Sequence, residues 1–231
     1  MRELTSDRPK CMLEVNGVPM FKRQTEILLS NGISNINVVV GYKKEWFEEF
    51  NFTCFENTDY EHNNILHSLF YAEETMDSDF FFAYSDIVYE SVIVRQMLNS
   101  KADIAVAIDR DWIGYHEGRS DHPIAEAELA FSKDGKTVSS IKIDADYKNA
   151  FGEFLGIAFF SKKGIQVLKT VFFELKEYYS NHPNQPFHSA KIFQKAYLTD
   201  MFQELINRGQ QIDIVTIEGS WAEIDRPGDL K

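Results

Sequence analysis

Residues 80–86 read Phe-Phe-Phe-Ala-Tyr-Ser-Asp, an uninterrupted hydrophobic run that ends in a serine and an aspartate. Such a run is typical of a strand buried on both faces of a parallel sheet. Similar runs occur at 36–40, closed by Gly41, and at 104–108, followed by Asp109. Segments with helical spacing, at 20–28, 64–76 and 92–98, separate them. Strands alternating with helices predict an α/β fold with a doubly wound, Rossmann-like sheet.

The pattern changes after Asp109. Residues 126–131 and 137–143 flank Lys-Asp-Gly-Lys at 133–136, which predicts a hairpin turn. A strand at 154–160, two helices at about 162–179 and 189–207, and a final strand at 212–217 follow. We expect one domain over 1–231, in which a parallel nucleotide-binding half (1–109) and an antiparallel or mixed acceptor-binding half (110–231) share one sheet.

Both ends of the sequence are abrupt. The chain opens on a polar segment with no preceding strand, and it closes at 229–231, where a helical pattern only begins. We therefore expect a chain truncated at both ends, compatible with a domain of a larger protein.

Composition excludes several classes of protein. A net charge of −12 argues against a nucleic-acid partner, because phosphate backbones require a basic face. No hydrophobic stretch approaches the roughly 20 residues that span a bilayer, so no membrane partner is expected. Cys11 and Cys54 offer neither metal-ligand spacing nor a disulfide framework, which suits the cytoplasm, and the six histidines show no zinc spacing. The oligomeric state is not predicted.

Residues 2–10, Arg-Glu-Leu-Thr-Ser-Asp-Arg-Pro-Lys, precede a brief strand at 12–15, a turn at Asn16-Gly17 and a helix. This order resembles the start of the sugar-phosphate and phosphocholine nucleotidyltransferases, whose fold is of the nucleotide-diphospho-sugar transferase type. In that family a strand and a glycine-rich loop come first, and here the loop would lie just before Met1. The resemblance implies that Lys10 faces the transferring phosphate, where its ammonium stabilises developing charge. Otherwise Lys10 is a surface lysine after a turn.

Asn63-Asn64 and Ser68 form the second motif. Phosphocholine-type cytidylyltransferases carry a similar Asn-Asn with a following Ser-Leu, at a helix beside the nucleobase. An amide offers both donors and an acceptor, which suits the edge of a base. The resemblance favours CTP as the nucleotide, while helix capping by one of the two asparagines is the structural alternative.

Asp86 ends the hydrophobic run, where doubly wound sheets bind ligands. The family carries a magnesium-binding Asp here, often as Asp-x-Asp, although Tyr84 replaces the first Asp in this sequence. The segment Trp221-Ala222-Glu223-Ile224-Asp225 resembles the family's late motif, in which an Asp completes the metal site. We therefore expect Asp86 and Asp225 to bind Mg²⁺, and Ser85 to contact the nucleotide. The ordinary alternatives are a turn at Asp86 and a strand end at Asp225.

Acceptor-binding candidates lie mainly in the second half of the chain. A phosphate, phosphonate or ammonium group would bind there through arginine pairing or an aromatic cage. A solvated loop is the structural alternative for residues 109–122. The candidates are Glu153, Arg110, Trp112, Tyr115, Arg119 and Glu223.

The sequence thus predicts a Mg²⁺-dependent cytidylyltransferase. The phosphate or phosphonate oxygen of a small acceptor would attack the α-phosphorus of CTP in line, and pyrophosphate would leave. Lys10, Asp86 and Asp225 would carry the catalysis by alignment and electrostatics, without a protein nucleophile. A sugar-1-phosphate uridylyl- or thymidylyltransferase is the alternative enzyme. An inactive nucleotide-binding or regulatory domain is the alternative outside the enzymes, and the absent glycine loop favours it.

Overall fold

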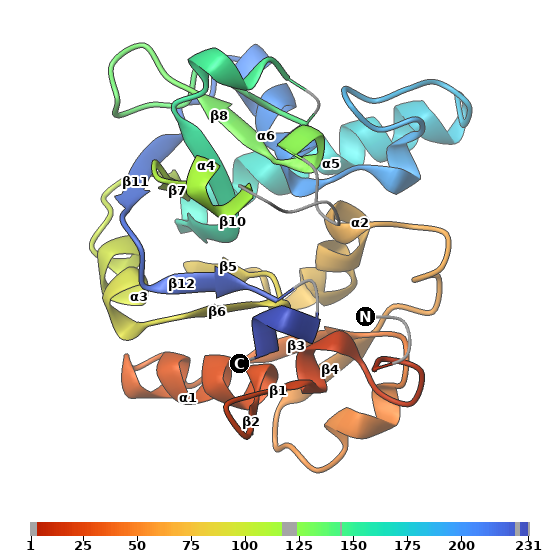
Figure 1. Ribbon diagram of the computed structural model, residues 1–231. Helices are drawn as coiled ribbons and strands as arrows, with labels where there is room; N and C mark the ends of the chain where they lie inside the picture. Colours follow the sequence, from red (N-terminus) through yellow and green to blue (C-terminus); the bar gives the residue numbers. More distant parts are fainter. Residues whose placement is uncertain (1–3, 117–123, 144, 225–226, 231) are drawn as a thin grey trace.

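The computed structural model describes residues 4–116, 124–143, 145–224 and 227–230 (Figure 1). Its largest sheet has six strands. They run in the order β11-β7-β10-β8-β9, and β5 also pairs with β10. The strands are β5 (Phe80–Ala83), β7 (Ile104–Asp109), β8 (Leu129–Phe131), β9 (Ser140–Lys142), β10 (Gly152–Phe160) and β11 (Asp213–Ile217).

The sheet is mixed in direction. β11 pairs with β7 in parallel, whereas β10 is antiparallel to β5, β7 and β8. The β8–β9 pair is the hairpin expected around 133–136, and Asp134 Oδ1 accepts the backbone N–H groups of Lys136 and Thr137 in its turn. Strands from both sides of residue 109 therefore lie in one sheet.

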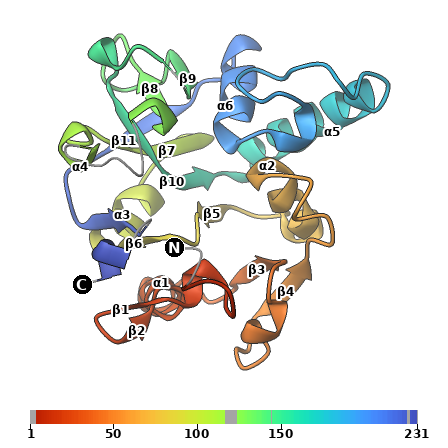
Figure 2. The same ribbon diagram turned by 45° about the vertical axis from the view of Figure 1, so that its right-hand side comes forward.

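Helices cover both faces of this sheet, as Figures 1 and 2 show. Alternate residues of β7 point to opposite faces. Ile104 and Ile108 pack in a core with α5 (Lys162–Ser180) and α6 (Leu198–Asn207), whereas Ala105 packs with α3 (Ser91–Leu98) on the other face. Burial on both faces explains why these strands lack polar alternation.

Three small strand pairs lie outside the main sheet. β3 (Asn37–Val40) and β4 (Thr53–Glu56) form a parallel pair. β1 (Glu14–Val15) and β2 (Val18–Pro19) form a hairpin whose turn residues have positive φ, 51° at Asn16 and 75° at Gly17, as a type I′ turn requires. β6 (Ile87–Tyr89) pairs with β12 (Trp221–Glu223).

Most elements lie where the pattern of hydrophobic residues predicts them. α1 (Met20–Ser30) follows Pro19, and Gly32 adopts a φ of 84° after its end. The expected helix at 64–76 is α2 (Ile65–Leu69) followed by the 3₁₀ helix η3 (Phe70–Thr75). The remaining short helices are η1 (Lys10–Met12), η2 (Lys44–Phe47), α4 (Ile113–His116), η4 (Ile124–Glu126), η5 (Tyr147–Asn149), η6 (Phe193–Lys195) and η7 (Pro227–Leu230).

Two expectations were wrong. The helix expected from 189 begins only at Leu198, because a Phe187–Ala190 bridge and η6 come first and Asp200 then forms a capping box with Tyr197. The hydrophobic run at 36–40 does form β3, but β3 pairs with β4 and not with the main sheet.

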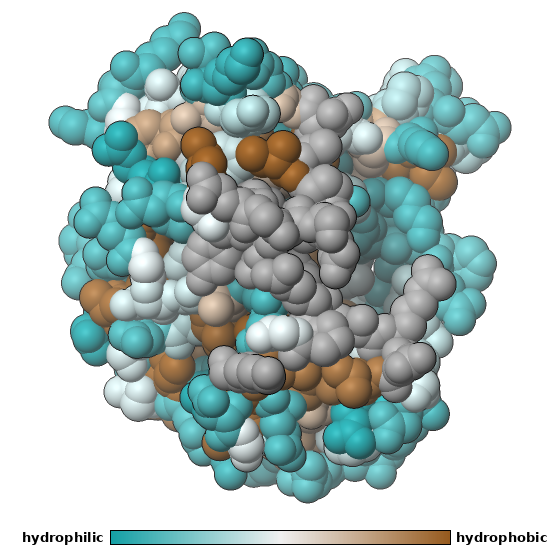
Figure 3. All heavy atoms as spheres, viewed as in Figure 1, coloured by the Kyte–Doolittle hydropathy of each residue, from teal (hydrophilic) through white to brown (hydrophobic). Residues whose placement is uncertain are grey.

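Most of the described surface in the view of Figure 3 is hydrophilic, with smaller hydrophobic groups between. Among the described helices, none combines the length and the apolar character that crossing a membrane requires.

Candidate functional site

A salt bridge joins two residues that are 76 positions apart in the sequence. The Lys10 ammonium donates to Asp86 Oδ2 at 3.0 Å, and both side chains are about one-third exposed, at 29% and 32%. Asp86 lies three residues beyond the carboxyl end of β5, and Lys10 opens η1. The fold thus places a cation and a carboxylate, both predicted catalytic residues, together at a solvent-accessible edge.

The backbone around Asp86 is fixed from two directions. The buried Gln24 amide donates to the carbonyls of Tyr84, at 2.8 Å, and Ile87, at 2.6 Å, so α1 holds both ends of the turn. From the other end of the chain, the Ile224 N–H donates to the Asp86 carbonyl at 3.1 Å. Gln24 was not predicted from the sequence, because a glutamine within a helical pattern carries no signal of such a partner.

The late motif therefore lies beside the early one. Glu223 pairs with Ile87 in the β12–β6 ladder, and Ile224 packs with Leu13, Val15 and Met20. Asp225, the predicted second magnesium ligand, lies outside the described residues. The residue before it, Ile224, contacts the main chain of Asp86.

More carboxylates lie along the same edge of the sheet. Glu153, the second residue of β10, lies opposite Asp109, the last residue of β7, and both are almost fully buried. The Trp221 indole N–H donates to Asp109 Oδ2 at 3.0 Å, and the Asp111 N–H donates to Oδ1. Burial raises the pKa of Asp109 above its usual value, and these hydrogen bonds oppose that shift. Asp109 ends a hydrophobic run just as Asp86 follows one, so the sequence did carry a signal for it.

Glu128 is a carboxyl group that the sequence did not single out. Its Oε2 atom is buried and has no hydrogen-bond partner in the described part of the chain, while Oε1 accepts from the Tyr84 hydroxyl at 3.3 Å. Burial raises the pKa of Glu128 to about 8, and the negative charge of Glu153 adds to this shift. Glu128 therefore holds its proton at neutral pH.

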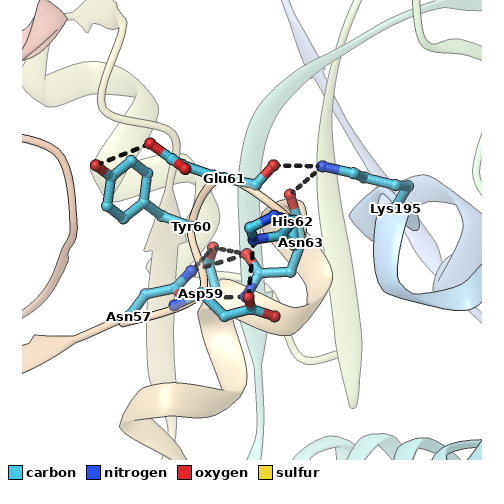
Figure 4. A network of polar contacts seen from close by, with 8 residues as sticks. Asn57, Asp59, Tyr60, Glu61, His62, Asn63 and Lys195 are labelled. Atoms are coloured by element: carbon cyan, nitrogen blue, oxygen red, sulfur yellow. Dashed lines mark hydrogen bonds and ion pairs between the residues drawn. The ribbon is translucent and has the colours of Figure 1, made fainter.

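The asparagine motif forms an internal network (Figure 4). Asn63 is buried and exchanges two amide hydrogen bonds with Asn57, at 2.8 and 2.9 Å, and Asn57 also donates to Ser68 Oγ at 2.8 Å. The Asn64 side chain caps α2 by accepting the Ile65 N–H. Capping, the structural alternative, thus applies to Asn64. The side-chain amide of Asn63 is hydrogen-bonded to that of Asn57. A contact of Asn63 or Asn64 with the nucleobase stays a prediction.

The predicted acceptor residues occupy different surroundings. The Arg110 guanidinium lies 5.1 Å from the centre of the Phe151 ring. Trp112 is 2% exposed and packs with Ala127 and Leu129, so its ring belongs to a small core. The side chain of Tyr115 and the whole of Arg119 lie outside what the structure describes, whereas Ser85 is exposed and Glu223 is half-buried.

The described residues contain no group of three His, Cys, Asp or Glu side chains close enough to hold a metal ion. The donor chemistry at Asp86 nevertheless suits a hard cation, since a carboxylate oxygen already binds the Lys10 ammonium there. Mg²⁺ typically takes one or two carboxylates together with waters and substrate phosphates.

Comparison with known proteins gives one family match. The model of the MobA-like NTP transferase domain matches residues 3–169, more than half of the chain. A curated relative, the CTP:phosphoglutamine cytidylyltransferase of Campylobacter jejuni, is 28% identical over 239 aligned residues, covering 99% of this chain and 92% of that protein.

Two solved structures share the fold. The inositol-1-phosphate CTP transferase of T. maritima superposes with a TM-score of 0.73 at 19% identity, covering 100% of this chain and 86% of that one. The CTP:phosphocholine cytidylyltransferase of Streptococcus pneumoniae gives 0.72 at 23% identity, covering 99% and 90%. The predicted family and the α/β fold class are confirmed.

Proposed function

The chain belongs to the MobA-like NTP transferase domain family and is therefore a nucleotidyltransferase, and from this premise we propose that it transfers CMP from CTP to a small phosphorylated or phosphonate acceptor. One observation carries the proposal, namely the 3.0 Å contact of Lys10 with Asp86 at the edge where β5 ends. The relative from Campylobacter jejuni and the two similar structures, from T. maritima and Streptococcus pneumoniae, are named as enzymes that use CTP, which supports the choice of nucleotide.

In the proposed reaction an acceptor oxygen attacks the α-phosphorus of CTP, and the bond from that phosphorus to the pyrophosphate oxygen breaks. Lys10 would transfer its hydrogen bond from Asp86 to the α-phosphate and stabilise the charge that grows on its oxygens. Asp86 and Asp225 would hold Mg²⁺, which supplies Lewis-acid stabilisation of the phosphates and orients them. No side chain needs to act as a nucleophile, because alignment and electrostatics account for most of phosphoryl-transfer catalysis.

The acceptor would bind beside the edge that carries Asp109, Glu128, Glu153 and Glu223, where the carboxyl groups of the first three are buried and Glu223 is half-buried. Carboxyl groups there favour an acceptor that carries a nitrogen group besides its phosphate, since an amide N–H donates to them and a quaternary ammonium is attracted by negative charge. Phosphoglutamine and phosphocholine, the acceptors named for two relatives, both have such nitrogen groups.

The test is pyrophosphate release from CTP, UTP, dTTP and ATP with Mg²⁺, using phosphocholine, 2-aminoethylphosphonate, phosphoglutamine and glucose-1-phosphate as acceptors. CTP with a nitrogen-bearing acceptor should give the highest kcat/KM. Lys10→Ala and Asp86→Asn should each lower kcat by about 10²- to 10³-fold, the usual cost of removing one preorganised charge at the reacting phosphate.

The matched control is Lys22→Ala, which removes an exposed lysine of α1 that forms only a 3.9 Å surface pair with Glu26. It should leave kcat within about twofold, because exposed pairs contribute little. The proposal fails if no nucleotide supports turnover, or if Lys10→Ala and Asp86→Asn are as active as this control. A preference for UTP or dTTP with glucose-1-phosphate would instead favour the sugar-1-phosphate alternative.

A further inference from the structure

Glu128, one of the carboxyl groups beside which the acceptor would bind, has one oxygen atom without a partner. Its backbone carbonyl accepts the Phe154 N–H at 2.8 Å, so β10 fixes its position. Oε1 accepts from the Tyr84 hydroxyl at 3.3 Å, whereas Oε2 is buried and has no hydrogen-bond partner in the described part of the chain. The residue as a whole is half-buried, so its carboxyl group lies beneath the surface and not at the centre of the core.

A second oxygen without a partner lies beside it. Thr199, in the first turn of α6, is fully buried, and its hydroxyl makes no hydrogen bond to any described residue. Burial raises the pKa of Glu128 to about 8, whereas the nearby hydroxyls of Thr199 and Tyr84 lower it, which places the Thr199 hydroxyl next to the carboxyl group. Buried polar atoms are almost always paired in native proteins. Two unpaired oxygens at one place therefore indicate a polar group that binds there.

The tyrosine that contacts Oε1 is itself held in place. The N–H of Tyr84 donates to the Gly156 carbonyl at 2.9 Å. Gly156 has a φ of 71°, and a Cβ at this residue would lie 2.3 Å from the Tyr84 ring. The register between β10 and β7 shifts at the same point. β10 thus leaves room for the ring of Tyr84, which reaches from the turn that carries Asp86 to Glu128.

The charges around Glu128 select the sign of its ligand. Glu153 of β10 and Asp200 of α6 both act on it, and both are negative. Asp200 already accepts the backbone N–H groups of Ser189 and Tyr197. An anionic group placed here would be repelled, whereas a cation is attracted. The surroundings of Glu128 therefore favour a positively charged ligand.

Binding of an ammonium group leaves no buried charge alone. Without a ligand Glu128 keeps its proton, because burial disfavours the charged form. When an ammonium group enters, this proton leaves to solvent and the carboxylate pairs with the ammonium, so the net charge of the site stays the same. Glu128 Oε2 and Thr199 Oγ1 can each accept a hydrogen bond, and a primary ammonium has N–H donors for both. A quaternary ammonium has none.

We propose that Glu128 selects an acceptor with a primary ammonium group, whose N–H groups donate to Glu128 Oε2 and to the Thr199 hydroxyl. Tyr84 is the positioning residue that holds the other carboxyl oxygen. Because Tyr84 comes two residues before Asp86, a short spacer suffices to join the ammonium group to the reacting phosphate or phosphonate. The inference rests on the proposed function, whose acceptor it narrows from nitrogen compounds in general to primary amines.

The first test compares ethanolamine phosphate, phosphocholine and ethyl phosphate as acceptors with CTP and Mg²⁺. The first two differ only in the methyl groups on nitrogen, and ethyl phosphate lacks the nitrogen. The wild type should use ethanolamine phosphate with a kcat/KM at least about tenfold above that for phosphocholine, because the quaternary group leaves the buried oxygens unpaired.

Substitutions separate recognition from a structural role. Glu128→Gln should lower kcat/KM for ethanolamine phosphate by about 10- to 100-fold, mainly through KM, and leave ethyl phosphate within about threefold. Tyr84→Phe should lower it by about 3- to 10-fold, since one neutral hydrogen bond is lost. The matched control, Glu177→Gln, changes an exposed glutamate of α5 and should leave all three acceptors unchanged.

A second measurement does not require turnover. Calorimetry at pH 7 in two buffers with different heats of ionisation counts the protons released when ethanolamine phosphate binds. The wild type should release about one proton more with ethanolamine phosphate than with ethyl phosphate, and Glu128→Gln should release no more with one than with the other.

The outcomes distinguish the two proposals. Turnover of ethyl phosphate, together with an unchanged preference among acceptors in Glu128→Gln, overturns this inference and keeps CMP transfer. Equal use of phosphocholine, or proton release that does not depend on Glu128, also overturns it and makes Glu128 a structural group. Absence of turnover with every acceptor, with the proton release intact, rejects CMP transfer and keeps the ammonium site.

Discussion

β10 and β5 are neighbouring strands with similar hydrophobic sequences and different surroundings. All nine residues of β10 are buried, whereas the four residues of β5, three of them Phe, are only half-buried. β10 has partners along both edges. β5 has one on its β10 side, and on its other side it borders a cavity of about 790 Å³ that β3 also lines, here called the slot. β3 repeats the pattern of β5 with three valines.

The difference teaches that a hydrophobic run specifies a strand but not the number of its neighbours. β5 has the sequence of a strand buried at the centre of a sheet, yet in the described fold it has the hydrogen bonding of an edge. The burial of such a run therefore depends on the tertiary fold and not on its sequence alone. The fully paired β7–β10 centre and the slot should accordingly respond differently to the same substitution.

The largest difference is expected for two phenylalanines on neighbouring strands, which pack on opposite faces of the sheet. Phe160 of β10 is 0% exposed and stacks on Phe80 at 4.8 Å, whereas Phe81 of β5 is half-buried beside the slot. Phe160→Ala should lower the free energy of unfolding by about 3–5 kcal/mol, the usual cost of a large-to-small change in a core. Phe81→Ala should cost less than half as much, because the slot already lies beside it. Urea titration of both variants measures this, and equal losses would remove the contrast.

The second prediction concerns the buried Glu128 beside the β7–β10 centre. Its pKa is about 8 in the folded protein and about 4.5 in an exposed carboxyl, so the folded state holds a proton that the unfolded state releases between these values. The contribution of Glu128 to stability is thus largest below about pH 4.5 and is lost as pH rises through 8. At about 1.4 kcal/mol per pKa unit, the loss is a few kcal/mol by pH 9.

Glu128→Gln keeps the shape without the charge and should remove this loss. Urea titrations at pH 5, 7 and 9 measure the slope, with the exposed Glu45→Gln as the control that retains it. If the free energy of unfolding of Glu128→Gln depended on pH as in the wild type, the proton released on unfolding would be bound by another group.

Sequence reasoning succeeded where one local pattern sufficed. Proline before a helix, glycine after it, and continuous hydrophobic runs placed α1, β7 and β10 within a few residues. It failed at 189–197, where the Phe187–Ala190 bridge and the capping of Asp200 are contacts between residues that no periodicity connects. The pairing of β3 with β4 could not be predicted from the sequence either, because the composition of a strand does not identify its partner.

The site shows the same division. Lys10 and Asp86 were identified through a family motif, and the fold brings them to 3.0 Å. Glu128 was not identified, because a single glutamate between alanine and leucine does not indicate that its carboxyl group is buried. Asn63 looked like a polar group free to bind a base, yet its amide pairs with Asn57, a residue whose role depends on the tertiary fold.

A smaller effect is expected at a glycine of the buried centre. A Cβ on Gly152 would lie 2.2 Å from the Asp109 carbonyl oxygen, which is backbone and cannot rotate away. Gly152→Ala should therefore cost about 1–3 kcal/mol through overpacking. The control, Gly114→Ala, meets no atom within 4 Å and should be neutral or slightly stabilising. Thermal unfolding of both variants makes the comparison, and similar midpoints would show that β10 shifts to accommodate a methyl group.

The smallest effect tests the slot itself. Val106→Thr in β7 buries a hydroxyl group at a fully enclosed position and should cost about 1–3 kcal/mol, the range found for an unpaired buried polar group. Val39→Thr in β3 makes the same change at a half-buried residue that lines the slot, where water reaches the hydroxyl, and should change stability by less than about 0.5 kcal/mol. Urea titration of both variants makes the comparison, and an equal cost at the two positions would show that water does not reach residue 39.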